Sequence, residues 1–432
     1  MVVWEFPCES RTLSGIDTEN LVIVVTRFFL VKKKKPKSWC FCLDYRRRTL
    51  ILVLWSSLIG YIMNKFSSGV PKVSDFSGTR HIGLDIARSI AIVLVLFSHA
   101  RYLVGEPGTY FFLTIGAKFG VELFFVLSGF LIGTILLKSF DSGINSSSLF
   151  RFWVRRWLRT LPAYFSVLLF VWVIFDEVNF FYFFFLQDLV LGNWNLMPVS
   201  WSLVIEEWFY LMFPLLVIGF SFFYPRSAFL LSALFLCCLS IVYPMQEYFS
   251  CSNNVDSLSC FENEVRKSTF RFGSLGIGVL IAYMQHRLDL RSAMNRRIKT
   301  LFFCLLISLL LVTLFSYQVA SGNILDGAST VLYFCIFYPL MGFVAGLTII
   351  FLFSIDLKFP IVPLKLISFV SITSYSNYLW HMLVFDYLKT WKGEIDSEYL
   401  VLAFFSVSFF VAGLSYLIIE KPFLTLRNKV AS

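Results

Sequence analysis

Charged residues are scarce in this chain. Only 15% of its 432 residues are Asp, Glu, Lys or Arg, whereas a soluble globular domain has roughly 25%. This scarcity excludes a soluble enzyme and an intrinsically disordered chain. Hydrophobic residues instead make up 58% of the sequence. The composition indicates a polytopic integral membrane protein.

Several other patterns are missing. The apolar segments are continuous blocks of about 20 residues, which do not alternate as the strands of a transmembrane barrel do. The nine cysteines lack the paired spacing of a zinc site, so we predict no metal centre. Cys251 and Cys260 lie in a polar loop, where they form a disulfide if the loop is outside the cytoplasm. The net charge of +10 is typical of cytoplasmic loops, and we expect no nucleic-acid partner.

The first 80 residues differ from the remainder. Two apolar runs, 21–31 and 50–63, are separated by basic residues, and each is shorter than the roughly 20 residues that span a bilayer. Neither run is followed by the small-residue cleavage site of a secretory signal. We therefore interpret residues 1–80 as an atypical N-terminal extension or leader, and hypothesise that the true start is Met63.

Ten long apolar blocks follow, and each predicts a membrane-spanning helix. The blocks cover residues 84–104, 119–137, 161–176, 199–219, 228–244, 270–286, 300–317, 330–353, 366–388 and 399–419. Basic clusters precede the third block, follow the sixth, eighth and tenth, and lie on one side if all ten blocks span. The positive-inside rule assigns that side to the cytoplasm. We predict an all-α membrane domain over residues 81–425 with about ten spans, both termini in the cytoplasm, and a short tail over 426–432.

A further aromatic run covers residues 180–191. If this run spanned the membrane, the basic residues between 287 and 299 would fall on the outer side. About 12 residues are too few to cross a bilayer as a helix. We predict a short interfacial or re-entrant segment.

The first long block contains ionisable residues, which are costly inside a membrane and often functional. Arg88 and His99 are 11 residues apart, so a helix presents both on one face, separated by about 16 Å along its axis. Asp85 is placed to hold Arg88 in an ion pair. Arginine grips phosphate and histidine is the usual general base, so this pair suits a long ligand with an anionic head. The alternative is a packing hydrogen bond from His99 and an Arg88 that reaches the membrane surface.

Three more regions carry polar groups within apolar sequence. Adjacent carboxylates, Glu206 and Glu207, lie in the fourth block, where they bind an arginine or a substrate hydroxyl, or form a salt bridge that fixes helix packing. His381 lies in the ninth block, and taken alone it indicates a packing hydrogen bond. A basic cluster before the third block forms either a membrane-surface anchor or a phosphate cradle beside Arg88. The cluster contains Arg151, Arg155, Arg156 and Arg159.

These residues, in this order, resemble acyltransferase family 3, the integral-membrane acyltransferases that modify surface polysaccharides and other hydroxyl acceptors. The resemblance covers residues 80–425. It rests on the R-x10-H pattern of Arg88 and His99, Phe119 to Ile132, Arg156 to Arg159 with Leu161 to Tyr164, Trp201 to Tyr210 with Phe213-Pro214, Arg271 with Gly276 and Gly278, Tyr375 to His381, and Ile419 to Phe423. Ser98 and Trp208 depart from the residues more usual in the family.

The resemblance implies an enzyme that moves an acyl group, most often acetyl, from cytoplasmic acyl-CoA to a hydroxyl of a surface glycan or a lipid-linked sugar. No tightly bound cofactor is expected. Arg88 and the cluster of Arg155, Arg156 and Arg159 are expected to bind the donor's anionic groups. His99 is expected either to deprotonate the acceptor or to take the acyl group itself.

Glu206 or Glu207 is expected to orient His99 or the acceptor, and His381 to act as a second polar group. The expected location is a bacterial inner membrane, with lipids and a carbohydrate acceptor as partners. Two other functions stay open. A transporter of lipid-linked sugars would use the same polar residues to line a path, and a non-catalytic scaffold would tolerate replacement of His99.

Overall fold

The computed structural model describes most of the chain after residue 80. The described ranges are 81–105, 111–141, 143, 145–175, 178–187, 197–251, 271–320, 327–355 and 360–430. The N-terminal extension, the hypothesised start at Met63 and the Cys260 half of the expected disulfide lie outside these residues.

Within the described ranges, all regular elements are helical. In chain order they are α3 (Ile82–Val104), α4 (Phe111–Asp141), α5 (Ser146–Phe175), the 3₁₀ helix η4 (Phe180–Phe184), α7 (Ser200–Phe223), α8 (Ala228–Cys251), α10 (Phe272–Leu288), α11 (Leu290–Asn295), α12 (Ile298–Ala320), α13 (Gly327–Ser354), α14 (Ile361–Lys389), α15 (Ser397–Ser415), the π-helix η6 (Tyr416–Glu420) and α16 (Lys421–Val430). The predicted all-α class is therefore confirmed.

The number of membrane spans is confirmed only in part. Each of the ten predicted blocks overlaps one long helix, and seven helices in the described chain are long and apolar enough to cross a membrane. The other three are α8, α10 and α14. The apolar part of α8 ends at Tyr243, and α10 has only 17 residues. α14 is interrupted by serine, threonine and asparagine between Ser368 and Asn377.

The aromatic run after α5 forms no long helix in its described part. It contains η4, whose five residues are too few to cross a bilayer. The Tyr164 hydroxyl donates to the carbonyl of Tyr182 at 2.9 Å, and the Trp208 indole donates to the carbonyl of Phe185 at 3.0 Å. These bonds attach the segment to α5 and α7, as an interfacial or re-entrant segment requires.

Helices α4 and α10 pack against each other more extensively than any other described pair, and glycine permits their close approach. A Cβ at Gly129 would lie 2.1 Å from the carbonyl oxygen of Leu275, and one at Gly278 would lie 2.1 Å from that of Val126. Small residues let helix backbones approach closely in membrane proteins, where packing replaces the hydrophobic drive. The Arg271–Glu122 ion pair, with Ser274 also bonded to the carboxylate, joins the same two helices.

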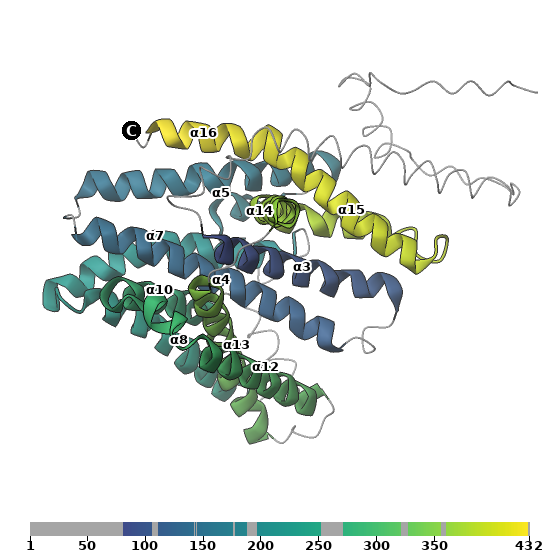
Figure 1. The fold of residues 1–432 in the computed structure, drawn as a ribbon. Helices are drawn as coiled ribbons and strands as arrows, with labels where there is room; N and C mark the ends of the chain where they lie inside the picture. The colour runs from purple at the N-terminus through teal and green to yellow at the C-terminus, as the bar shows by residue number, and fades with distance from the viewer. Residues whose placement is uncertain are drawn as a thin grey trace, which may run out of the picture. The chain divides into compact units, whose positions relative to one another are not determined.

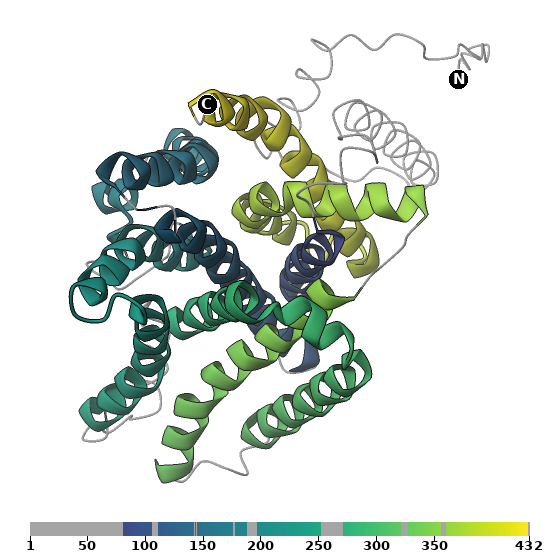
Figure 2. The same ribbon diagram turned by 60° about the vertical axis from the view of Figure 1, so that its left-hand side comes forward.

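Helix α3 lies at the centre of the described bundle, between α16 and α5 at one edge and α12 at the other (Figures 1 and 2). It packs most extensively against α4 and α14. The Ser371 hydroxyl of α14 donates to Asp85 at 2.7 Å, and the Ser89 hydroxyl donates to the carbonyl of Ile367 at 3.1 Å. These polar bonds fix how α3 and α14 present their side chains to each other.

Candidate active site

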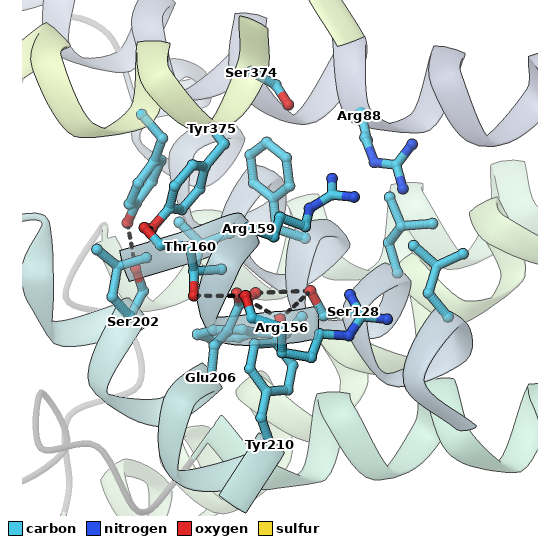
Figure 3. A pocket seen from close by; sticks show the side chains of 17 residues that line it. Arg88, Ser128, Arg156, Arg159, Thr160, Ser202, Glu206, Tyr210, Ser374 and Tyr375 are labelled. Carbon is cyan, nitrogen blue, oxygen red and sulfur yellow. Dashed lines mark hydrogen bonds between the residues drawn. The ribbon is translucent and has the colours of Figure 1, made fainter. Parts of the chain in front are cut away.

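A cavity opens where α3, α4, α5, α7 and α14 meet (Figure 3). It holds about 100 Å³ of space for water-sized molecules, and a single water needs only about 10–15 Å³ on that measure. The polar side chains that line it are those of Arg88, Ser128, Arg156, Arg159, Thr160, Ser202, Glu206, Tyr210, Ser374, Tyr375 and Tyr378. We refer to it as the arginine cavity.

The guanidinium groups of Arg88, which is on α3, and of Arg156 and Arg159, which are on α5, lie in the right half of Figure 3. Arg88 is held by Asp85 at 3.4 Å, which confirms the expected ion pair. Arg156 lies 5.7 Å from the centre of the Tyr210 ring. Among the described carboxylates, none forms an ion pair with Arg156 or Arg159. The cavity therefore carries an excess of positive charge, as an anion-binding site requires.

The one cavity-lining carboxylate belongs to a small hydrogen-bond network. Ser128 donates to one oxygen of Glu206 at 2.8 Å, and Tyr210 donates to the other at 2.9 Å. The neighbouring Glu207 accepts a hydrogen bond from Thr160 at 2.7 Å. Both carboxylates thus join α7 to α4 or α5, and only Glu206 faces the cavity.

Two tyrosines of α14 close the cavity on the other side. The hydroxyls of Tyr378 and Ser202 share a hydrogen bond of 2.7 Å, and the Tyr375 hydroxyl donates to the backbone carbonyl of Thr160 at 3.0 Å. Figure 3 shows Tyr375 and Ser202 to the left of the three guanidinium groups. The cavity therefore has one cationic wall and one wall of hydroxyl groups.

The two histidines that the sequence singled out lie against each other. The rings of His99 and His381 stack with their centres 5.0 Å apart and an angle of 17° between them. His381 is completely buried. We refer to these two residues as the histidine pair. Neither of them lines the arginine cavity.

The hydrogen bonds of His381 define its tautomer. Its Nδ1 lies 2.8 Å from the carbonyl of Tyr378 and 3.1 Å from that of Asn377. Carbonyls only accept hydrogen bonds, so Nδ1 carries the proton, and in the neutral ring Nε2 is left with a lone pair. Nε2 has no partner in the described structure. Since buried polar atoms are nearly always paired, His381 offers an unused proton acceptor.

Tyr378 is the link between the two regions. It lines the arginine cavity, its ring centre is 5.7 Å from that of His381, and its carbonyl fixes the His381 tautomer. Phe124 stands edge-on to it at 6.2 Å. The histidine pair and the arginine cavity are therefore adjacent sites separated by one aromatic side chain.

The structure brings most of the predicted site residues into these two groups. Arg88, Arg156, Arg159 and Glu206 meet in the cavity, and His99 and His381 form the pair. The remaining two lie outside both. The Glu207 side chain bonds to Thr160 without lining the cavity, and the Arg155 side chain is exposed.

None of the seven hydroxyl-bearing residues that line the cavity was predicted from the sequence as a site residue. A signal was present for two of them, since Ser202, Glu206 and Tyr210 are spaced four apart and so share one helical face. Ser128 and Tyr378 carried no comparable signal, because their partners lie 78 and 176 residues away.

Comparison with known proteins supplies the family context. A family model described as an acyltransferase domain matches residues 81–420. The chain is 26% identical over 379 residues to the putative O-acetyltransferase SACOL0978 of Staphylococcus aureus, which covers 79% of this chain and 57% of that protein. It is 32% identical over 197 residues to the putative peptidoglycan O-acetyltransferase YrhL of Bacillus subtilis, covering 37% of this chain and 28% of the relative.

A third relative is the peptidoglycan O-acetyltransferase OatA of Listeria monocytogenes, 28% identical over 166 residues, which covers 32% of this chain and 24% of OatA. The chain spans little more than half the length of the first of these relatives. No solved structure matches it.

Proposed function

The chain belongs to acyltransferase family 3, and from that premise we propose that it transfers an acetyl group from acetyl-CoA to a hydroxyl of a cell-surface glycan. One observation carries the proposal. A single helix, α3, presents Arg88 to a cationic cavity and His99 to a stacked histidine pair, with about 16 Å of helix between them. An extended donor with anionic phosphates at one end and a thioester at the other could place its phosphates in the cavity and its thioester at the histidine pair.

The arginine cavity is the proposed site for the anionic part of the donor. Arg156 and Arg159 have no carboxylate counterpart within the described chain, so their charge is available to a ligand. Guanidinium groups bind phosphate oxygens by strong charge-assisted hydrogen bonds. The opposite wall of hydroxyl groups supplies neutral hydrogen-bond partners for the polar arm of the donor.

The histidine pair is the proposed site of chemistry. His99 attacks the thioester carbon, the carbon–sulfur bond breaks, and the thiolate leaves and takes up the proton that the imidazole releases. The acceptor hydroxyl then gives its proton to His381 Nε2 and attacks the acetyl-imidazole, and His99 is released. The tautomer supports this assignment, because Nε2 of the neutral ring is already free of a proton. That proton then passes from His381 to the nitrogen of His99 as it leaves the acetyl group, so both imidazoles end the cycle neutral.

The donor is proposed to enter from the cytoplasmic side of a bacterial inner membrane. The support is the distribution of basic residues, which cluster at the ends of the helices on the side where α16 ends. Transfer then occurs deeper along α3, toward the outer side. The acceptor is proposed to be a carbohydrate such as peptidoglycan, on the strength of the names carried by the relatives.

The test compares alkali-released acetate from the surface glycans of cells that lack the protein with that from complemented cells. Wild type is expected to restore the acetate, and the His99→Ala variant at equal membrane abundance is expected not to. His286→Ala is the matched control, since His286 pairs with Asp141 at 2.6 Å away from both sites. Equal restoration by wild type and His99→Ala would refute the mechanism.

A further inference from the structure

A second cationic group lies beyond the histidine pair. Arg101 is in the last turn of α3, two residues after His99, and its side chain is only 7% exposed. Arg88 precedes His99 on the same helix. The histidine pair therefore has a guanidinium toward each end of α3, and the one on Arg101 is buried.

The guanidinium group of Arg101 forms a hydrogen bond through one nitrogen, and its other two nitrogens have none within the described residues. Its guanidinium lies 4.3 Å from the centre of the Tyr102 ring, and Nη2 donates to the Tyr102 hydroxyl. Nε and Nη1 have no hydrogen-bond partner in the described structure. None of the described carboxylates forms an ion pair with Arg101.

This arrangement leaves a buried charge without an anion. Burying a charge is costly, and the cost is recovered only when a counter-charge and hydrogen bonds accompany it. The Tyr102 ring and the negative end of the α3 dipole each stabilise the buried charge in part. Neither of them provides a hydrogen-bond acceptor for Nε and Nη1. An anion bound at these two nitrogens supplies both the counter-charge and the acceptors.

Arg101 belongs to the surroundings of the histidine pair. The Tyr102 ring lies edge-on to Phe385 with centres 6.4 Å apart, and Phe385 lies 6.4 Å from the His99 ring. The Lys392 ammonium donates to the Tyr102 carbonyl at 2.9 Å, which adds a second cation to the same end.

We propose that Arg101 is an anion subsite for the acceptor, and that it binds a carboxylate or a phosphate carried by the acceptor glycan. The assignment to the acceptor rests on the proposed function, because the donor's phosphates are assigned to the arginine cavity at the other end of α3. An anion subsite at Arg101 implies that the acceptor is an acidic glycan and not a neutral one.

The first experiment measures binding without turnover. The purified full-length protein is unfolded thermally in detergent with the disaccharide of N-acetylglucosamine and N-acetylmuramic acid, with its neutral methyl ester, and with methyl phosphate. A ligand that binds only the folded state raises the unfolding temperature, and at equal concentration the tighter ligand raises it more. Stabilisation by the free acid or by methyl phosphate, and not by the ester, is the expected result. Whichever of the two anions raises the unfolding temperature more shows whether the subsite prefers a carboxylate or a phosphate.

The second experiment repeats these measurements on variants. Arg101→Gln is expected to remove the difference between acid and ester, and Arg101→Lys to retain part of it. Lys389→Gln, which removes an exposed positive charge near the end of α14, is the matched control and is expected to keep the difference. In turnover with acetyl-CoA, Arg101→Gln is expected to raise the acceptor KM at least tenfold and to leave the KM for acetyl-CoA unchanged.

Three results would overturn the proposal. The first is that neither anion stabilises the wild type more than the ester does. The second is that Arg101→Gln retains the difference. The third is that Glu106→Gln, which removes the carboxylate five residues along the chain, destabilises the protein as much as Arg101→Gln does, since the chain itself would then supply the anion. The binding measurements need no catalysis, so they fail or succeed independently of the proposed transferase activity.

Discussion

The arginine cavity and the histidine pair are neighbours with opposite characters. The cavity is polar and open enough for several water molecules, and two of its cations have no carboxylate partner in the described chain. In the pair, His381 is completely buried and His99 is partly buried. Both regions are anchored on α3 and α14, with Tyr378 between them. The difference indicates that binding of charge and transfer of the acyl group take place in separate environments.

The largest effects are expected within the histidine pair, and they should differ between its two members. His99→Ala removes the nucleophile, so we expect no acetylated enzyme when the protein is mixed with radiolabelled acetyl-CoA. His381→Ala removes only the base that acts on the acceptor. It should still form the acetylated enzyme, while transfer falls by about 10²–10⁴-fold, the usual contribution of a general base.

The control for this pair of variants is His286→Ala, which should resemble wild type in both labelling and transfer. If His99→Ala labels normally, the acyl group is carried elsewhere or passes directly to the acceptor. If His381→Ala transfers at the wild-type rate, its unpaired Nε2 has no part in the reaction.

A smaller effect is expected from Glu206, which we assign to positioning. Glu206→Gln keeps the size of the side chain, but its NH₂ group faces a hydroxyl donor and one hydrogen bond is lost. Hydrogen bonds to charged groups contribute about 1.5–3 kcal/mol, so the free energy of unfolding should fall by about that amount. The KM for acetyl-CoA should not rise, because removing a negative charge strengthens the cationic wall. A raised KM with unchanged stability would show instead that Glu206 contacts the donor.

The helical class and the shared face of Arg88 and His99 were predictable because they depend on local pattern. A run of about 20 apolar residues has few alternatives to a helix in a membrane, and Arg88 and His99 share a face through helical geometry alone. The Asp85 ion pair followed from the same reasoning, since the two residues are three apart.

The tertiary partners were not predictable in this way. The bond between Ser202 and Tyr378 joins residues 176 positions apart, and the ion pair of Glu122 with Arg271 likewise depends on which helices pack together. Arg155 shows that closeness in sequence can also mislead. It belongs to the same basic cluster as Arg156, which lines the cavity, but its own side chain is exposed. A helix turns by about 100° per residue, so neighbours in sequence point to different surroundings.

The difference between Arg155 and Arg156 can be tested directly, and we expect an effect of intermediate size. Arg155→Gln and Arg156→Gln remove the same charge from adjacent positions of α5. We expect Arg156→Gln to raise the KM for acetyl-CoA by about tenfold, which corresponds to about 1.4 kcal/mol of binding free energy. Arg155→Gln should change it much less, since an exposed charge acts through solvent. Equal effects in the two variants would place the donor's phosphates outside the cavity.

Tyr378 should show a modest effect on both regions together. Tyr378→Phe retains the ring beside His381 and removes the hydroxyl that bonds to Ser202. A neutral hydrogen bond contributes about 0.5–1.5 kcal/mol, so we expect a small fall in thermal stability and a fewfold fall in kcat. Ser202→Ala is the partner variant, and the double variant should be no worse than either single one. Additive losses would mean that the two hydroxyls act separately.

The smallest effect is expected at His81, which precedes α3 outside both sites. Burial lowers the pKa of His81, and the nearby Arg291 lowers this pKa further. The unfolded chain therefore binds a proton more readily than the folded one, and stability falls as the pH drops below about 6.5, the ordinary histidine value. His81→Gln should reduce the loss of thermal stability between neutral and mildly acidic pH. An unchanged pH dependence would show that other groups control it.

The most direct test of the central claim measures kcat and the KM for acetyl-CoA on Arg156→Gln and His381→Ala side by side, in lipid nanodiscs. If charge is bound in the cavity and the acyl group is transferred at the pair, Arg156→Gln raises the KM for acetyl-CoA and preserves kcat. His381→Ala slows only the second half of the reaction, so it lowers kcat and the KM for acetyl-CoA together and leaves kcat/KM for acetyl-CoA unchanged. The contrary result is that both variants change the same parameter in the same proportion. The two regions would then form one site, and the division between them would be wrong.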